Sequence, residues 1–190
     1  IGPIMVGPSS SHTAGAVRLG LVARAILGRQ PSEATIELHG SFAQTGKGHG
    51  TDRGLVAGLL GMATDDPDLR RSFELAAAAG LNFTFADVDL GEDAHPNSVR
   101  LTVGDGERAV QVTGCSIGGG LVEITTVDGY DVRFGCEYDT LLVLAEDRPG
   151  TINQVTGWLA RQGINIAFLR VERNKRGGDA IMIIETDAMI

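Results

Sequence analysis

Residues 140–150 read Thr-Leu-Leu-Val-Leu-Ala-Glu-Asp-Arg-Pro-Gly, and this stretch decides the fold of the C-terminal part of the chain. Its first six residues form an almost continuous apolar run, which is typical of a buried strand. The run ends at Asp147-Arg148-Pro149-Gly150, where the chain is expected to turn. Residues 151–162 then carry apolar side chains at helical spacing, and Gly163 is suited to end that helix.

The residues that follow complete a β-α-β-β order. Ile164–Val171 predicts a second strand, Gly177-Gly178 a turn, and Ala180–Thr186 a third strand. We place this unit at residues 138–190 and a larger unit at residues 1–137, because the character of the sequence changes near Cys136–Asp139. The chain as a whole is predicted to be α/β (α+β).

The larger unit begins with helical and strand-like segments. Residues 14–30 carry an i, i+4 apolar stripe that predicts a helix, with Ser11 or Thr13 as its N-cap. Residues 34–42 alternate as a strand does, and the glycines of Gly46–Gly50 predict a loop. Further helices are expected at residues 51–62 and from Asp66-Pro67 to a stop at Gly80.

From residue 81 the pattern is that of strands. Candidates lie at residues 81–88, 98–103, 109–113, 121–127 and 130–134. Asp105-Gly106 and Asp128-Gly129 have the composition of hairpin turns. This part is therefore expected to form an antiparallel meander.

Composition argues against several classes of function. The net charge is −8 and no block of Lys and Arg offsets it, so the field of the protein would oppose a nucleic-acid backbone. No stretch reaches the roughly 18–20 apolar residues of a membrane helix, and no secretory signal is visible. We expect a cytoplasmic protein that binds neither nucleic acid nor membrane.

Cys115 and Cys136 are the only cysteines. Two thiols form no disulfide framework and their spacing fits no zinc pattern. Both are therefore expected to be buried, apolar-like residues in a reducing compartment. A cluster with three or four thiolate ligands cannot be held by this chain alone.

Ser9-Ser10-Ser11-His12-Thr13 stands directly before the first predicted helix. The free N–H groups and the positive dipole end of a helix favour an anion there. The hydroxyls add hydrogen bonds, and the histidine adds an acid/base group. The pattern is typical of a pocket for an acidic or amino-acid substrate, although an ordinary capped helix would have the same sequence.

Two further segments carry polar residues suited to binding. In residues 40–52 the glycines allow close backbone approach, and Lys47 and His49 could hold negative charge. The segment is no phosphate loop, because Gly48 stands where Ser or Thr should hold Mg²⁺. The second segment is His95-Pro96-Asn97-Ser98, at the entry of a strand. His39 is open to two interpretations, as a site residue or as a strand residue with no role.

Residues 7–15, 40–52, 95–97 and 114–120 resemble, in order and spacing, the β part of iron–sulfur L-serine dehydratases. With the C-terminal unit the resemblance covers nearly the whole chain. Cys115 departs mildly from it, since a small hydroxyl residue is expected there. The same domain resembles the small substrate- or effector-binding domain of some phosphoglycerate dehydrogenases.

This resemblance implies deamination of L-serine to pyruvate and ammonia, in serine catabolism and gluconeogenesis. A [4Fe–4S] cluster, held by three cysteines of an α subunit, would act as a Lewis acid on the serine hydroxyl. The chain would be inactive without that partner. The implied catalytic residues are His12, Ser11 and Thr13, and the implied substrate-binding residues are Ser9, Ser10, Lys47, His49 and Asn97.

The C-terminal unit resembles an ACT domain, a ferredoxin-like fold, through Asp147-x-Pro149-Gly150 and Gly163-Ile164-Asn165-Ile166. That resemblance implies a homodimer and effector contacts from Asp147, Gly150 and Asn165. A dimerisation sheet without a ligand is the alternative. The domain is expected to be incomplete, because a second helix and a fourth strand have no counterpart before Ile190. For the whole chain, a non-catalytic module that senses an anion and an amino acid is the second candidate function.

Overall fold

A computed structural model describes residues 4–187 apart from residues 174 and 176, and gives the backbone alone at residue 47. It divides into two compact units at Asp128/Gly129. No helix in this described part is long and apolar enough to cross a membrane. The elements in chain order are η1 (Ser10–Ala14), α1 (Gly15–Leu27), β1 (Glu33–Leu38), α2 (Gly40–His49), α3 (Thr51–Leu59), η2 (Pro67–Arg71), α4 (Ser72–Ala78), β2 (Asn82–Asp87), β3 (Ser98–Gly104), β4 (Ala109–Gly118), β5 (Leu121–Val127), β6 (Tyr130–Gly135), β7 (Asp139–Glu146), α5 (Thr151–Arg161), β8 (Ile166–Arg173) and β9 (Asp179–Thr186).

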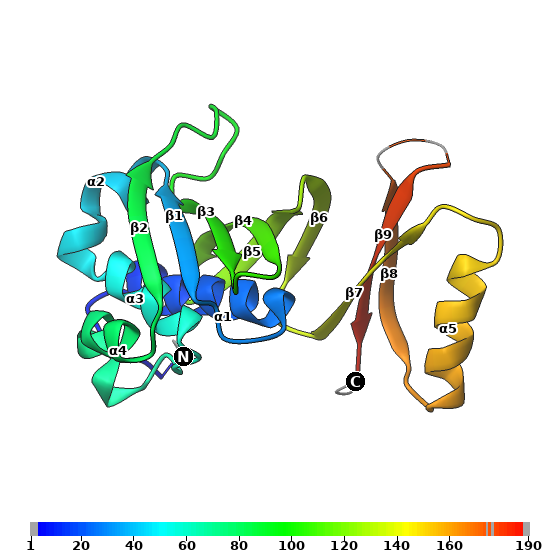
Figure 1. The fold of residues 1–190 in the computed structure, drawn as a ribbon, viewed down its shortest axis with the longest axis horizontal. Helices are drawn as coiled ribbons and strands as arrows, with labels where there is room; N and C mark the ends of the chain where they lie inside the picture. Colours follow the sequence, from blue (N-terminus) through cyan, green and yellow to red (C-terminus); the bar gives the residue numbers. More distant parts are fainter. Residues whose placement is uncertain (1–3, 174, 176, 188–190) are drawn as a thin grey trace. The chain divides into compact units, whose positions relative to one another are not determined.

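The first sheet has the strand order β2-β1-β3-β4-β5-β6 (Figure 1). β1 pairs in parallel with β2 and antiparallel with β3. The β3–β4 and β4–β5 pairs are antiparallel, which confirms the meander expected from the sequence. The parallel β1–β2 pair needs a long crossover, and the helices between the two strands supply it.

One face of this sheet is covered by α1 and α3. Along β1 the residues alternate, so that Ala34, Ile36 and Leu38 are buried against the helices. The two helices cross at short range because each has a glycine at the contact. A Cβ atom at Gly58 would lie 2.1 Å from the carbonyl oxygen of Val17. This packing fixes the position of α1, and the serine-rich N-terminal segment directly precedes α1.

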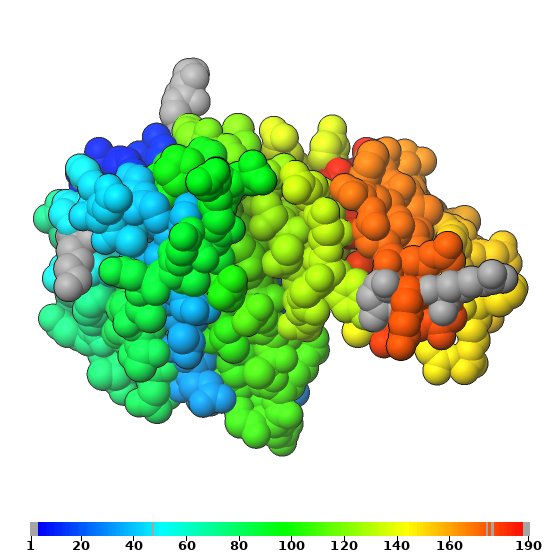
Figure 2. Space-filling model, turned by 90° about the horizontal axis from the view of Figure 1, so that it is seen from above, coloured from blue at the N-terminus to red at the C-terminus, as the bar shows by residue number. Residues whose placement is uncertain are grey.

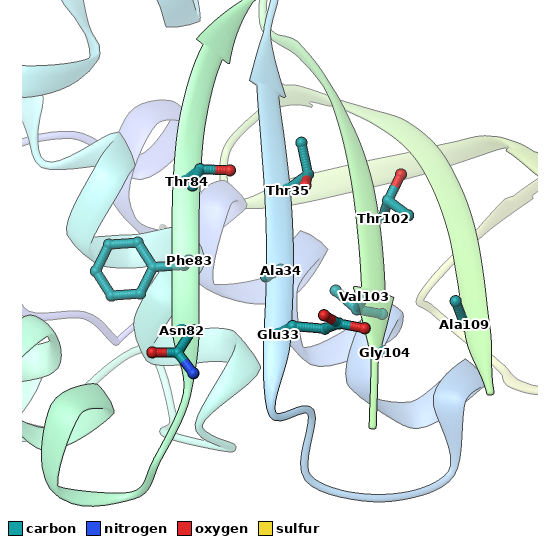
Figure 3. Close-up of a pocket in the computed structure, with 10 residues that line it drawn as sticks. All are labelled: Glu33, Ala34, Thr35, Asn82, Phe83, Thr84, Thr102, Val103, Gly104 and Ala109. Carbon is teal, nitrogen blue, oxygen red and sulfur yellow. The ribbon is translucent and has the colours of Figure 1, made fainter. Parts of the chain in front are cut away.

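The other face of the sheet is polar. Thr35, Thr84 and Thr102 lie on it, together with Asn82 and Glu33, around a shallow hollow of about 470 Å³ (Figure 3). None of the polar residues singled out in the sequence lines this hollow. The serine-rich segment and residues 40–52 lie elsewhere in the first unit.

The second unit contains a three-stranded antiparallel sheet of order β7-β9-β8. Leu159 of α5 is fully buried against Met182 and Ile184 of β9. The predicted β-α-β-β order is therefore confirmed. The expectation that β7 is a buried strand is wrong: none of its residues is fully buried and Leu144 is 60% exposed, because β7 lies at the edge of the sheet and α5 packs on one face only.

The largest difference from the sequence prediction concerns α2. Residues 39–42 were expected to end a strand and residues 46–50 to form a loop, but β1 ends at Leu38 and a helix spans Gly40–His49. Phe42 of this helix is completely buried. Gly46 lies close enough to Thr51 that an added Cβ would be 3.3 Å from the threonine Cβ. Tertiary packing thus overrides the low helix propensity of glycine.

Candidate functional site

The serine-rich segment starts the first helix with a π-turn. The carbonyl oxygen of Ser10 accepts the N–H of Gly15, five residues along. Ser9 caps the turn, since its Oγ accepts the N–H of His12 at 3.1 Å. The prediction that Ser11 or Thr13 is the N-cap is therefore wrong, because both residues lie inside the turn. Single π-turns are rare in proteins as a whole, but those that occur are often found at functional sites.

The ring of His12 lies against one stripe of α2. Its Nε2 is 3.1 Å from Oγ1 of Thr45 and 3.2 Å from Oγ of Ser41. The ring centroid is 5.1 Å from that of His49 and 5.4 Å from that of Phe42, which it meets edge-on. Residues 41, 45 and 49 are spaced i, i+4, i+8, so a single face of the helix presents all three to the imidazole.

The pKa of His12 lies below its ordinary value of 6.5. Burial is the larger cause, because it disfavours the charged imidazolium, and the nearby His49 adds repulsion when it is protonated. His12 is consequently neutral at neutral pH. A neutral imidazole has one nitrogen free to accept a proton.

The start of α2 is held by the loop that contains His95-Pro96-Asn97. The carbonyl oxygen of Pro96 accepts the N–H groups of Ser41 at 2.7 Å and Phe42 at 3.4 Å. Gly40 has a φ of +55°, and a Cβ there would lie 2.7 Å from this oxygen. Figure 2 shows the loop in green beside α2 in light blue and the N-terminal segment in dark blue. Three segments distant in the sequence therefore meet on one face of the first unit.

His39 also ties this loop to α2. It precedes the helix, and its Nδ1 accepts the N–H of Leu90 at 3.2 Å. The ring thus contacts the loop rather than the His12 cluster. His39 is therefore not a residue of strand β1, and its ring is not in contact with the His12 cluster.

Asn97 links the same loop to β4. Its side chain donates to the carbonyl oxygen of Ser116 at 3.4 Å, and its own carbonyl accepts the N–H of Ser116 at 3.0 Å. The Oγ of Ser116 is completely buried, has no hydrogen-bond partner among the described residues, and lies where a Cβ at Gly15 would be, 2.1 Å away. The glycine-rich turn after Ser116 is in this way held beside the π-turn.

The other predicted site residues occupy different positions. Thr13 is buried, and its hydroxyl donates to the carbonyl of His49 at 2.9 Å. The hydroxyls of Ser10 and Ser11 are half-buried and make no hydrogen bond to another described side chain or backbone group. Lys47 belongs to α2, but its side chain lies outside the described residues.

Ser41 and Thr45 were missed in the sequence. Their i, i+4 spacing is a signal of a shared helix face, but only for a segment that is recognised as a helix. The glycines around them indicated a loop instead. The structure thus adds two hydroxyls beside His12 and His49, which the sequence had singled out separately.

An open hollow of about 410 Å³ adjoins the cluster, between residues 6–13 and residues 48–53. Gly7, Pro8 and Thr13 line one side of it. Arg53 and Arg70 line the other, and no sequence pattern had singled them out. This hollow, unlike the one on the open sheet face, is bounded by two of the three segments expected to bind substrate, the serine-rich segment and residues 40–52.

In the second unit the three predicted effector contacts are engaged within the protein. Asp147 accepts hydrogen bonds from Arg173 at 3.0 Å and from the N–H of Gly177 at 3.3 Å. Gly150 precedes α5 with a φ of +93°. The Asn165 amide donates to the carboxylate of Asp187. Asp147 therefore fastens the turn between β8 and β9.

The comparisons with known proteins agree with this division of the chain. The family model described as serine dehydratase beta chain matches residues 1–126, and the ACT domain model matches residues 140–190. The chain is 42% identical over 190 residues to the probable L-serine dehydratase, beta chain, of Bacillus subtilis, covering all of this chain and 86% of that protein. It is 44% identical over 189 residues to the L-serine dehydratase, beta chain, of Peptoniphilus asaccharolyticus, covering 98% and 85%.

The expected likeness to phosphoglycerate dehydrogenases is also found. The D-3-phosphoglycerate dehydrogenase of Methanocaldococcus jannaschii is 32% identical over 110 residues, covering 58% of this chain and 21% of that enzyme. The family model and the two relatives, by contrast, extend over most or all of the chain. The chain therefore belongs to the serine dehydratase beta chain family and carries an ACT domain at its C-terminal end.

Proposed function

We propose that this chain is the β subunit of an L-serine dehydratase that converts L-serine to pyruvate and ammonia, and that it supplies one wall of the active site. The observation that carries the proposal is the position of the His12 imidazole. It stands on a serine-rich π-turn and is held by Thr45 and Ser41 of α2. We assign His12 to substrate positioning or proton handling.

The chain's own residues do not fit an iron–sulfur cluster. Of its two cysteines, Cys115 is buried, and burial together with the nearby Glu123 raises the pKa of its thiol. Cys136 is exposed in the link after β6, so the expectation that both thiols are buried is wrong. Among the described residues no group of three His, Cys, Asp or Glu could hold a metal ion. We therefore assign the [4Fe–4S] cluster to a partner α subunit and derive no step through it.

The contribution of this chain is then binding and proton transfer. The serine carboxylate is expected at the N-terminus of the first helix, where the dipole and the hydroxyls of Ser10 and Ser11 favour an anion. A neutral His12 beside it can accept a hydrogen bond or the α-proton of the substrate. Arg53 and Arg70 line the adjoining hollow together with Asp52, so the charged residues there sum to +1.

The test is reconstitution with the α partner under anaerobic conditions. His12→Ala is expected to lower kcat by something like 10²–10⁴-fold, as for a positioned acid/base group. Thr84→Ala, on the exposed polar face of the sheet, is the control and should keep full activity. Both variants should still co-purify with the partner. Near wild-type turnover by His12→Ala would refute the role, and a wild-type complex that makes no pyruvate would favour the non-catalytic sensing module.

For the ACT domain we propose pairing with a second copy and binding of a small amino acid. Calorimetry with L-serine should show binding that Asn165→Ala weakens, since this amide lies at the start of β8. The matched control is Gln162→Ala, at the exposed end of α5. If no heat is measured for the wild type, the domain is a dimerisation element without this effector.

A further inference from the structure

We propose that Thr45 is a positioning residue that holds His12 in the tautomer with the proton on Nε2, so that Nδ1 is the nitrogen that accepts a proton. The catalytic consequence rests on the proposed function of His12. The tautomer itself follows from the hydrogen bonds around the ring.

The hydroxyl proton of Thr45 is already used in a hydrogen bond to the backbone. Oγ1 of Thr45 lies 2.8 Å from the carbonyl oxygen of Ser41, one helical turn earlier, and a carbonyl oxygen can only accept. A threonine hydroxyl has one proton to donate. Toward His12, at 3.1 Å, the same oxygen can therefore act only as an acceptor.

The second hydroxyl in the cluster is compatible with this arrangement. Oγ of Ser41 lies 3.2 Å from Nε2 and 3.4 Å from Oγ1 of Thr45. If its proton points to Thr45, it too presents a lone pair to the ring. An N–H at Nε2 then satisfies both oxygens, whereas a bare Nε2 would face the lone pair of Thr45 at hydrogen-bond distance.

A neutral imidazole carries a single ring proton, so Nδ1 is left with its lone pair. Among the described residues Nδ1 makes no hydrogen bond, and the backbone N–H of His12 is engaged with Ser9. If His12 takes the α-proton of serine, Nδ1 receives it. The C–H bonding pair then forms the Cα=Cβ bond, and the β-oxygen leaves as hydroxide with its own bonding pair, so that the proton on Nδ1 and the hydroxide together amount to one water. Thr45 touches no substrate in this scheme and acts through the imidazole.

The tautomer is measurable without catalysis. Ring ¹⁵N shifts of His12 are recorded on the full chain at a pH well above the titration of its histidines. The expected spectrum has an unprotonated Nδ1 and a protonated Nε2. Thr45→Val, which keeps the side-chain shape and removes the oxygen, should shift the ring toward a mixture. Thr45→Ser should restore the original spectrum. A protonated Nδ1 in the unmodified chain would overturn the proposal.

A second variant covers a failure of Thr45→Val to fold. Ser41→Ala keeps the Thr45 oxygen and the carbonyl that fixes its proton, so the tautomer should be unchanged. A reversed tautomer in that variant also overturns the proposal.

Activity of the complex with the α partner separates this inference from the proposed function. Thr45→Val should lower kcat about fivefold, the worth of one neutral hydrogen bond, with KM little changed, and Thr45→Ser should recover it. If the expected tautomer is found but His12→Ala remains active, the catalytic role fails and the positioning by Thr45 stands. If His12→Ala is inactive but Nδ1 carries the proton, the catalytic role of His12 stands and the positioning by Thr45 fails.

Discussion

Gly58→Ala tests the close crossing of α1 and α3, on which the position of the π-turn depends. The new Cβ would lie 2.1 Å from the carbonyl oxygen of Val17, 2.8 Å from the N of Leu21 and 2.9 Å from the Cα of Gly20. Ordinary contact begins at 3.4 Å. All three neighbours are backbone atoms, so no side chain can rotate away and the helices themselves must separate.

The expected cost follows from two opposing effects. Forcing a methyl group into a packed contact costs about 1–3 kcal/mol, and a rigid backbone neighbour places Gly58 at the upper end. Alanine in place of glycine inside a helix returns about 1 kcal/mol. The net loss is roughly 2 kcal/mol, which lowers the Tm of a chain of this size by about 4–8 °C.

Gly48→Ala is the matched control. Gly48 lies in α2, is exposed, and a Cβ there would meet nothing within 4 Å. This variant should gain about 0.5–1 kcal/mol from helix propensity alone.

The assay is urea unfolding followed by far-ultraviolet circular dichroism, which reports on both units. Fluorescence of Trp158, the only tryptophan, reports on the second unit, where α5 lies. Equal midpoints for Gly58→Ala and Gly48→Ala in the circular dichroism would refute the packing argument.

Of three more predictions, two concern the first unit and one the whole chain. Because the pKa of His12 is lowered on folding, the unfolded chain binds this proton more readily, so the free energy of unfolding should fall as pH drops through 6.5 and level off below the folded pKa. His12→Gln should flatten that slope in urea titrations at a series of pH values, and an unchanged slope would contradict the assignment. Ser116→Ala should be neutral or stabilising because it removes a buried hydroxyl without a partner in the described structure, whereas Ser98→Ala should cost about 1–2 kcal/mol through loss of the 2.6 Å bond to the His95 carbonyl; calorimetric Tm values in the reverse order would count against this. The purified chain should be colourless, since two cysteines cannot hold a cluster, and iron–sulfur absorption in its spectrum would disprove the assignment of the cluster to a partner.

Local sequence patterns predicted the elements that are marked at both ends. β5 spans Leu121–Val127, as expected, because glycines precede it and Asp128-Gly129 follows it. The C-terminal β-α-β-β order was equally visible, since the apolar spacing of α5 is that of a helix packed on a sheet.

α2 could not be predicted in this way. Its glycines indicate a loop, and what stabilises the helix is distant in sequence: the Pro96 carbonyl at its start and the burial of Phe42. The parallel pairing of β1 with β2 likewise depends on contacts across the intervening helices rather than on either strand alone.

The candidate site was likewise predicted only in part. The sequence singled out His12 and His49, and their rings lie 5.1 Å apart between centroids. Ser41 and Thr45 were missed because their alignment follows from α2 being a helix. The N-cap was predicted at Ser11 or Thr13 instead of Ser9, because a π-turn, with its extra residue, leaves no periodic signal in so short a segment.

The π-turn can also be described as a shift of helical phase. An α-helix advances roughly 100° per residue, so one inserted residue rotates everything before it relative to everything after it. In α1 the residues after the turn are fixed by the core, where Ala16 and Leu19 are buried. The extra residue lets His12 be aimed independently of that core. Deleting one residue within Ser10–Ala14 would leave a regular helix and an intact fold, with the imidazole turned away from α2.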